Sequence, residues 1–322
     1  MIKNKNIIIT GGVGFIGSHL FDNLIQNSNF LIIIDNFGSK NSENEKNYSV
    51  ITKNYEIEKD YLLINKNLLD NSIFKDINYD IDYIFHLAAI PGVRYSIQNS
   101  MKVSENNIIS TINIFEYAIK TQVKKVIYAS SSSVYGNPIY TPVDEEHPKN
   151  PISPYAVSKL CCEIYADYYF REYKLPVTSL RFYTVYGPRG RLDMAIRKFF
   201  INVLQNKPIE IYGNGNQLRD FTYISDIVEG LVLAAESDKS SGEIFNLGYS
   251  NPISVNDLIE KIYIITSKPK SIKNLGKEQG DVDTTYSKIE KAKKILSFEP
   301  KVDIDEGLKR TYEWQLENLD LK

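Results

Sequence analysis

The sequence predicts an α/β protein built on a doubly wound parallel sheet, and two observations carry this prediction. Short apolar runs alternate with longer segments of helical periodicity through the first half of the chain. These runs are apolar at nearly every position, which is typical of parallel strands that are buried on both faces. The strands are expected at 6–10, 30–35, 61–65, 83–89, 125–130 and 177–183, and the helices between them include 15–27, 105–120 and 155–173.

The pattern changes after about residue 184, where helical stretches mix with turns marked by Pro and Gly. This change predicts a smaller, mostly helical second domain. Residues 219–237 and 243–249 again have the pattern of a helix and a sheet strand, so the second domain should be discontinuous. Its helices are expected at 193–206, 254–265, 287–296 and 304–318. The predicted boundaries are 1–180 with 218–250 for the sheet domain, and 181–217 with 251–322 for the second domain.

The composition is that of a soluble globular protein. Of the 322 residues, 43% are hydrophobic and 24% charged, and the net charge of −2 does not favour nucleic acid or a membrane surface as a partner. No apolar run approaches the roughly 18–20 residues needed to span a bilayer. The N-terminal "NKNIIITGG" becomes Gly-rich too soon for a signal peptide. We therefore expect a cytoplasmic protein with no membrane or nucleic-acid partner.

Cysteine and histidine positions give no sign of a metal site. Cys161 and Cys162 are adjacent, and neighbours on a helix point about 100° apart, so a disulfide between them is geometrically awkward. None of His19, His86 and His147 has a second ligand at metal spacing. The sequence therefore predicts no bound metal, and it fits a reducing compartment.

The stretch "IIITGGVGFIGSHL" (7–20) has the pattern of an apolar strand, a Gly-rich turn and an amphipathic helix. Gly11 permits a tight turn, Gly14 lets a pyrophosphate approach the backbone, and Gly17 lets the helix pack close to the strand. The N–H groups that begin the helix can then bind phosphate. This arrangement predicts a Rossmann domain that binds a dinucleotide.

Asp35 ends the second expected strand, 24 positions after Gly11, where an acid binds the adenosine ribose in such domains. A carboxylate there accepts hydrogen bonds from the ribose hydroxyls and repels a 2′-phosphate, which favours NAD over NADP. Asn67 follows the third strand and has two interpretations, an adenine contact or an ordinary loop asparagine.

Tyr155 and Lys159 in "SPYAVSK" are four residues apart, so on a helix they share one face. An ammonium group beside the phenol should lower the pKa of Tyr155 and make it a base near neutral pH. The stretch "YASSSSVYG" (128–136) places four hydroxyls after an expected strand, at the edge where such side chains meet.

Together these stretches resemble the extended short-chain dehydrogenase/reductase superfamily, and within it the nucleotide-sugar 4-epimerases that act on UDP-glucose or UDP-glucuronate. The matching stretches run from residue 10 to 226. The resemblance implies that Ser131, Tyr155 and Lys159 are the catalytic residues. The stretches are "TGGVGFIGSHL", "HLAAIPGVRYS", "ASSSSVYG", "SPYAVSK", "LRFYTVYGPRGRLDMA" and "RDFTYISD".

The resemblance also implies a mechanism. Tyr155, helped by Ser131, removes the proton of the sugar 4-hydroxyl while hydride passes from carbon 4 to NAD. The 4-keto sugar then turns over and hydride returns to its other face, so NAD is a bound cofactor that is regenerated in each cycle. Members of this family pair as homodimers through the helices expected at 105–120 and 155–173, so a homodimer is expected.

The resemblance further implies two sets of ligand contacts. The NAD contacts are Gly11, Gly14, Phe15, Ile16, Gly17, Asp35, Asn36, Asn67, Leu68, Leu87, Ala88, Ala89, Asn107, Ser130, Tyr155, Lys159, Phe182 and Val185. The UDP-sugar contacts are Arg94, Ser131, Ser132, Ser133, Tyr155, Thr184, Arg191, Tyr212, Arg219 and Asp281.

The absence of an acid at Ser132 and Ser133 favours epimerisation. The sugar 4,6-dehydratases that this sequence resembles carry an Asp-Glu pair there, and UDP-glucuronate decarboxylases a Glu at the second position. A serine hydroxyl does not ionise near neutral pH, so the keto sugar should return unbroken. The alternative is a UDP-glucuronate decarboxylase or another NAD-dependent enzyme that modifies nucleotide sugars on this fold.

The identity of the sugar stays open in the sequence. Arg94 and Arg191 are candidates for binding a 6-carboxylate, directly or through the hydroxyls of Thr184, Ser132 and Ser133. Each arginine is equally interpretable as a surface or diphosphate contact.

The rest of the substrate site departs from the family at two places. Arg219 matches the diphosphate-binding arginine, Tyr212 is expected to pack on uracil, and Asp281 to bind the uridine ribose. Glu278 stands where many members have an arginine, so the diphosphate should depend more on Arg219 and backbone N–H groups. Thr285 is small at a position that is often bulky, which leaves UDP-N-acetylglucosamine open beside UDP-glucose and UDP-glucuronate.

Overall fold

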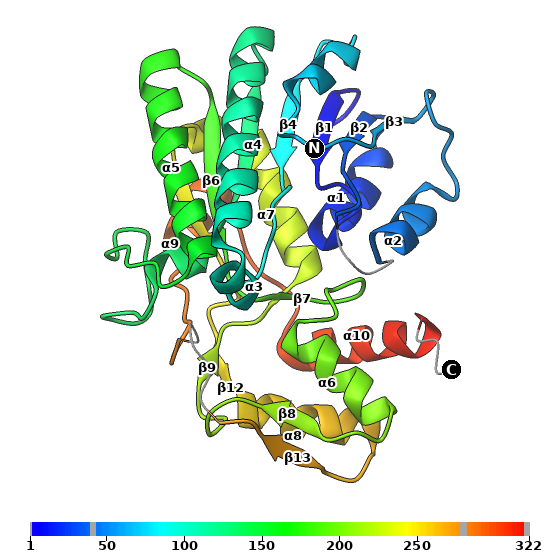
Figure 1. Ribbon diagram of the computed structural model, residues 1–322, viewed down its shortest axis with the longest axis vertical. Coiled ribbons are helices and arrows are strands. Elements are labelled where there is room, and N and C mark those ends of the chain that lie inside the picture. Colours follow the sequence, from blue (N-terminus) through cyan, green and yellow to red (C-terminus); the bar gives the residue numbers. More distant parts are fainter. Residues whose placement is uncertain (1, 39–42, 277–281, 319–322) are drawn as a thin grey trace.

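The computed structural model describes residues 2–38, 43–276 and 282–318. Its main body is a seven-stranded sheet in the order β11-β6-β5-β4-β1-β2-β3, with every pairing parallel. Helices cover this sheet, and a smaller body lies at one end of it (Figure 1). The predicted doubly wound α/β fold is confirmed. The strands are β1 (Asn6–Thr10), β2 (Phe30–Ile34), β3 (Tyr61–Ile64), β4 (Tyr83–His86), β5 (Lys125–Ser131), β6 (Val177–Phe182) and β11 (Ile244–Leu247).

Helices on both faces explain why the strands are apolar at every position. Ile7 and Ile9 of β1 pack in one core cluster with α1 and α7, whereas Ile8 packs in a second cluster with α4 and α5. Burying each such side chain contributes about 1.5–3 kcal/mol. The helices of the sheet body are α1 (Phe15–Ile25), α2 (Glu43–Thr52), α3 (Val93–Gln98), α4 (Ser100–Thr121), α5 (Pro154–Tyr173) and α7 (Ile224–Glu236), with short 3₁₀ segments η1 (Asn71–Asp76), η2 (Ser132–Tyr135) and η3 (Asp238–Ser240).

The smaller body is mostly helical, as predicted, and α6, α8 and α10 pack against one another in it. Its strands have two or three residues, too few to show a period in the sequence. α9 instead packs on β11 and α7, so residues 290–296 lie beside the sheet. The predicted domain boundaries stay a prediction. The helices and strands not yet given bounds are α6 (Ala195–Leu204), α8 (Val255–Thr266), α9 (Glu290–Leu296), α10 (Ile304–Asn318), β7 (Val185–Tyr186), β8 (Ile209–Ile211), β9 (Leu218–Arg219), β10 (Thr222–Tyr223), β12 (Ile253–Ser254) and β13 (Ile272–Asn274).

The sequence pattern does not predict α2, because that segment is polar and buries only Asn47 and Ile51. Within the described parts of the chain, no helix has the length and apolar character needed to cross a membrane.

The turn between β1 and α1 brings backbone against backbone. Gly11 has a φ of +68°, and a Cβ at this position would lie 2.9 Å from the Cα of Ala88. A Cβ at Gly17 would lie 2.2 Å from the carbonyl oxygen of Gly11 and 2.7 Å from the Cα of Gly12. The contacted atoms belong to the backbone, so no rotation of a side chain could relieve these contacts. α1 can pack this close to the end of β1 because both positions are glycines.

Replacing Gly17 by Ala should therefore lower the free energy of unfolding by about 3 kcal/mol, because the backbone must move apart. Gly14→Ala is the matched control in the same turn, since its Cβ would meet one backbone atom, at 3.1 Å. It should cost less than about 1 kcal/mol. Urea unfolding of both variants measures the difference, and equal losses would contradict the packing argument.

Candidate active site

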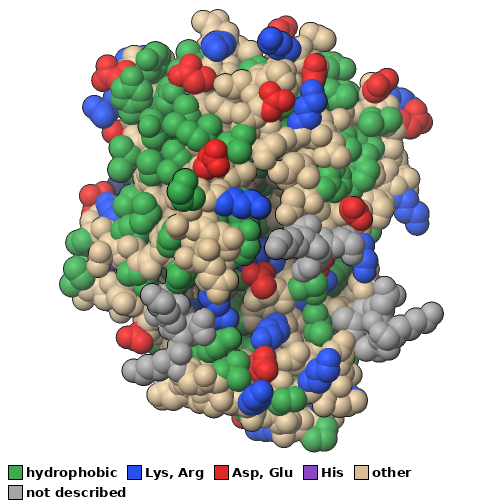
Figure 2. Space-filling model, viewed as in Figure 1, with side chains coloured by type: hydrophobic (Ala, Val, Ile, Leu, Met, Phe, Trp, Pro, Cys, Tyr) green, Lys and Arg blue, Asp and Glu red, His purple; other side chains and the backbone are tan. Residues whose placement is uncertain are grey.

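The predicted site residues meet at the carboxyl-terminal edge of the sheet, the usual ligand-binding edge of this architecture. The Gly-rich turn follows β1, residues 87–92 follow β4, the serines end β5, and 182–185 lie at the end of β6. Figure 2 shows that the surface between the two bodies is hollowed and that Lys and Arg side chains border the hollow. Phe15, Thr184 and Arg191 line one pocket there.

The first turn of α1 has backbone N–H groups available for an anion. The helix begins after Gly14, which has no side chain to cap it, so the N-cap residue contributes no hydroxyl or carboxylate to the N–H groups at the start of the helix. These groups and the positive end of the helix dipole form a phosphate site. The close packing at Gly11 and Gly17 fixes that site against β1 and β4.

Asp35 lies beside this turn, as the spacing predicts. Its carboxylate is buried at the end of β2 and accepts hydrogen bonds from the N–H groups of Val13 (3.2 Å) and Phe37 (2.8 Å). Burial raises the pKa of Asp35, and these hydrogen bonds oppose the rise. The acid is thus held in one orientation next to the phosphate site, where an adenosine ribose would lie.

The remaining residues predicted to bind NAD lie along the same edge. The N–H groups of Leu87 and Ala88 donate to Thr10 Oγ1 at 3.2 and 3.1 Å. Asn67 Oδ1 accepts from the N–H of Leu69 at 3.0 Å, as a loop asparagine does. The others lie at or just after the strand and helix ends, and their contacts with NAD stay a prediction: Ile16, Asn36, Leu68, Ala89, Phe182 and Val185.

Ser131, Tyr155 and Lys159 come together between β5 and α5. Ser131 ends β5, and its Oγ accepts hydrogen bonds from the N–H (3.2 Å) and the Oγ (2.9 Å) of Ser133. Ser131 also hydrogen-bonds the phenol of Tyr155. Lys159 Nζ lies 5.9 Å from the centre of the Tyr155 ring and donates to the carbonyl of Ala129 at 2.7 Å. The three predicted catalytic side chains therefore form one group.

The charges around Tyr155 differ from the sequence expectation. Burial raises the pKa of Tyr155, and the effects that lower it come from the Arg191 charge and the Ser131 hydrogen bond rather than from Lys159. The physical reason is that Lys159 Nζ is directed at the Ala129 carbonyl below the ring. Burial also lowers the pKa of Lys159 to about 8, so most of this side chain is charged at pH 7.

Arg191 is paired with an acid that the sequence reasoning missed. Its Nε and Nη2 donate to the two carboxylate oxygens of Asp193, at 2.9 and 2.6 Å. The carboxylate of an acidic sugar could bind Arg191 only if the guanidinium also kept its hydrogen bonds to Asp193. Ser132 and Ser133 lie in η2 beside Ser131, so hydroxyls form this side of the site.

Arg94 and Tyr212 are also in contact, although they were predicted to touch different parts of the substrate. The Arg94 guanidinium lies 4.0 Å from the centre of the Tyr212 ring, a cation–π distance. This contact joins α3 of the sheet body to the end of β8 in the smaller body. One face of Tyr212 is therefore covered by arginine, and the predicted stacking on uracil requires its other face.

Arg219 is the last residue of β9 and contacts the segment that follows the second gap in the described chain. It donates to the carbonyls of Leu218 (2.8 Å) and Val282 (2.6 Å). Thr285 Oγ1 accepts from the N–H of Asp220 at 3.0 Å. Asp281 and Glu278 lie outside the described residues.

Comparison with known proteins agrees with this geometry. Residues 7–248 match the NAD dependent epimerase/dehydratase family. The chain belongs to this family.

Several members are similar over nearly their whole length. A UDP-glucuronate 4-epimerase of Thermodesulfobacterium geofontis is 36% identical, over 98% of this chain and 97% of that protein. The crystal structure of UDP-glucuronic acid 4-epimerase from Bacillus cereus with UDP-glucuronic acid and NAD is 35% identical, with a TM-score of 0.91 over 97% of this chain and 99% of that one. UDP-N-acetylglucosamine 4-epimerase from Methanobrevibacter ruminantium in complex with UDP-N-acetylmuramic acid is 33% identical, with a TM-score of 0.90 over 99% and 100%.

Family membership confirms the resemblance seen in the sequence and the predicted dependence on NAD. The residues present fit that cofactor. A Cβ would fill the turn at Gly11 and Gly17, the start of α1 has uncapped N–H groups, and the Asp35 carboxylate lies beside them. Among the described residues, no group of His, Cys, Asp and Glu could hold a metal ion.

Buried polar side chains of β1, β4, α4 and α5 contact one another, and these contacts were not predicted. The His86 ring lies 2.8 Å from Thr10 Oγ1 through Nδ1 and 2.9 Å from Thr111 Oγ1 through Nε2. Asn107, predicted to bind NAD, is buried, donates to Ser158 Oγ (3.0 Å) and pairs with the backbone of Ile90. Polar residues within apolar segments are the sequence feature that could have indicated these side chains. The sequence alone does not say which of them form hydrogen bonds with one another.

His86 should make the protein less stable in acid. Burial lowers its pKa to about 3, from an ordinary value of 6.5, so between these pH values the unfolded chain binds the extra proton. Stability is therefore lost as the pH falls from 6.5 towards 3. His86→Gln should reduce this loss by up to about 1.4 kcal/mol per pH unit. Urea unfolding at pH 7, 6, 5 and 4 measures both slopes, and identical slopes would rule out a neutral His86.

Proposed function

We propose that this chain is an NAD-dependent 4-epimerase of UDP-sugars, acting on UDP-glucose or UDP-glucuronate through a 4-keto intermediate. The observation that carries the proposal is the group formed by Ser131, Tyr155 and Lys159 beside a rim of hydroxyls. Its position at the sheet edge, on the same side as the Gly-rich turn, supports the assignment of Tyr155 as the base that acts beside the cofactor.

The residues act in a simple order. Tyr155 takes the proton of the sugar 4-hydroxyl and later returns it, and Ser131 holds the phenolic oxygen by a hydrogen bond. The positive charge of Arg191 favours the phenolate, and Lys159 adds a buried ammonium below the ring. NAD, when bound, would supply the hydride chemistry at carbon 4 of the sugar.

The rim explains why the keto sugar should not be broken down. Ser132 and Ser133 offer hydrogen bonds and no carboxylate, so they supply no acid or base for loss of water or CO₂. Asp193 is bound on both oxygens by Arg191. Relatives that act on UDP-glucuronate and on UDP-N-acetylglucosamine are both similar to this chain, so the sugar must be found by experiment.

We also propose a homodimer. Hydrophobic side chains stand exposed along α4 and α5, on the upper left in Figure 2. Contiguous apolar surface of this kind is typical of an interface between protein chains. The thiols of Cys161 and Cys162 are both free, which fits the proposed cytoplasmic location. The exposed residues are Met101 and Ile109 of α4 and Val157, Ile164, Tyr168 and Tyr173 of α5.

A product panel tests the function. The purified protein is incubated with UDP-glucose, UDP-glucuronate or UDP-N-acetylglucosamine, and the nucleotide sugars are separated by anion-exchange chromatography. We expect at least one 4-epimer and no release of CO₂. UDP-xylose with CO₂ would favour the decarboxylase alternative, and a 4-keto-6-deoxy sugar a dehydratase. Bound NAD without any conversion would indicate a protein that binds dinucleotide but has no activity of this class.

Tyr155→Phe should keep NAD bound and lower kcat by about 100- to 10,000-fold, because it removes the group that moves the proton. Tyr168→Phe is the matched control, since it removes an exposed phenol from the same helix, and it should keep the wild-type kcat. Initial rates and the bound NAD per chain are measured for both. A wild-type rate in Tyr155→Phe would refute the assigned base.

A further inference from the structure

A row of buried polar side chains crosses three neighbouring strands beneath the candidate active site. Ser130 of β5, Arg181 of β6 and Asn246 of β11 are register partners, so their side chains project from the same face of the sheet. Arg181 is only 1% exposed. Positions of this kind normally carry apolar residues, because a buried charge is costly unless it is paired and hydrogen-bonded.

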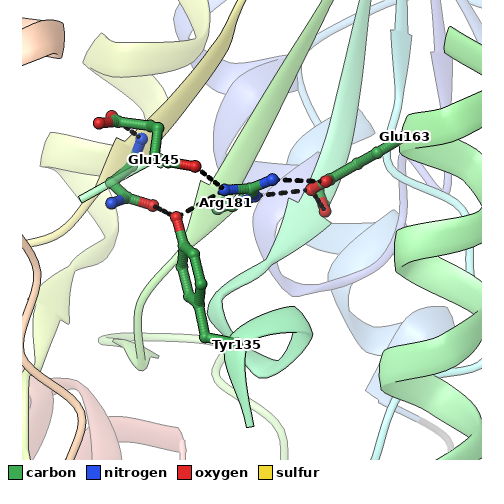
Figure 3. A network of polar contacts seen from close by, with 6 residues as sticks. Tyr135, Glu145, Glu163 and Arg181 are labelled. Carbon is green, nitrogen blue, oxygen red and sulfur yellow. Dashed lines mark hydrogen bonds and ion pairs between the residues drawn. The ribbon is translucent and has the colours of Figure 1, made fainter. Parts of the chain in front are cut away.

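The charge of Arg181 is paired with Glu163 of α5. Nε and Nη2 of Arg181 donate to Oε1 and Oε2 of Glu163 at 2.9 and 2.7 Å, and Ser130 Oγ donates to the same Oε1 at 2.5 Å. Figure 3 shows Arg181 lying between Glu163 on one side and Tyr135 on the other. A two-point pair of this kind fixes direction as well as distance.

Glu163 continues the helix face that carries the catalytic residues. Tyr155, Lys159 and Glu163 are spaced four apart on α5, and each contacts the end of β5. Tyr155 bonds Ser131, Lys159 bonds the carbonyl of Ala129 at 2.7 Å, and Glu163 bonds Ser130. The Glu163 contact is the third between this helix face and the end of β5, and it is shared with Arg181 of β6.

On its other side, Arg181 contacts the segment that carries the hydroxyl rim, which is formed by Ser132 and Ser133. Its Nη1 donates to the Tyr135 hydroxyl at 2.7 Å and to the carbonyl of Glu145 at 3.1 Å. Tyr135 in turn donates to Asn246 Oδ1 at 2.7 Å. Tyr135 is the last residue of η2, the segment that contains Ser132 and Ser133. One guanidinium therefore connects α5, β5, η2 and β11.

We propose that Glu163 and Arg181 are positioning residues, which hold Tyr155 and Lys159 at the correct distance from Ser131. Neither side chain is expected to touch sugar or cofactor. The expected change in kcat rests on the proposed function, whereas the placement of Lys159 is inferred from the geometry alone.

Glu163 also acts on Lys159 by its charge. Burial lowers the pKa of Lys159, and Cys162 and then the carboxylate of Glu163 oppose this lowering. Removing the carboxylate, and leaving Arg181 in place, should therefore lower this pKa and discharge Lys159 at a lower pH. The titratable groups that face Lys159 are Tyr155, Cys162 and Glu163 on its own helix, Tyr128 on β5 and His86 on β4.

Two variants test the proposal. In Glu163→Gln we expect kcat to fall at least about 10-fold, KM to change less than about threefold, and the alkaline limb of the kcat profile to move down by about one pH unit. In Ser130→Ala, which keeps the ion pair, we expect a smaller fall in kcat with the wild-type pH profile. NMR titration of ¹³C-labelled lysine reads the pKa of Lys159 directly, without turnover.

Lys125→Met is the matched control. Lys125 is a buried cation at the opposite end of the same strand, where it donates to Ser240 Oγ at 2.8 Å. Its loss should lower stability and leave kcat and the alkaline limb unchanged.

The outcomes separate the two proposals. Wild-type kcat and pH profile in folded Glu163→Gln and Ser130→Ala would overturn positioning. If Glu163→Gln does not fold, the kcat of Ser130→Ala decides. If the wild-type protein converts no UDP-sugar, the proposed function fails, and the Lys159 titration in Glu163→Gln decides the inference: a lowered pKa supports it, and an unchanged pKa overturns it.

Discussion

The ion pair between Arg181 and Glu163 is the interaction on which the arrangement of the site depends. It is buried between β6 and α5 and satisfied by hydrogen bonds on both partners. A buried pair adds little stability over an apolar pair of the same size, whereas the loss of one partner costs about 3–5 kcal/mol. Its effect is therefore geometric: α5, β5 and η2 must adopt the one arrangement in which neither charge is left alone.

Burial has opposite effects on the two titrating groups above this pair. It raises the pKa of Tyr155 and lowers that of Lys159 to about 8, so it disfavours the charged form of both. The site offsets this with charges placed around it, Arg191 beside the phenol and Glu163 beside the ammonium. The proposed proton transfer at Tyr155 thus depends on residues from α5 and from the segment before α6.

Much of the site could be predicted from local patterns. The turn at Gly11, the helix that follows it and the acid at Asp35 all came from spacing, because strand, turn and helix signals span a few residues. Tyr155 and Lys159 were placed on one helix face for the same reason. The pairs Arg191–Asp193 and Arg94–Tyr212 were not predicted. The first is close in the sequence, but its geometry depends on how the chain turns before α6, and the second joins segments that are far apart.

The sequence by itself determined the sheet, the dinucleotide turn and the candidates for the catalytic side chains, because these follow from short-range periodicity, from motifs of fixed spacing and from the family resemblance that the motifs carry. Only the tertiary structure decided which charges meet. Arg181, Ser130 and Asn246 have no fixed spacing in the chain, and they share a face only because β5, β6 and β11 pair in one register. Since the register is set by the packing of the whole sheet, the partners of a buried charge emerge only when the strands are assembled.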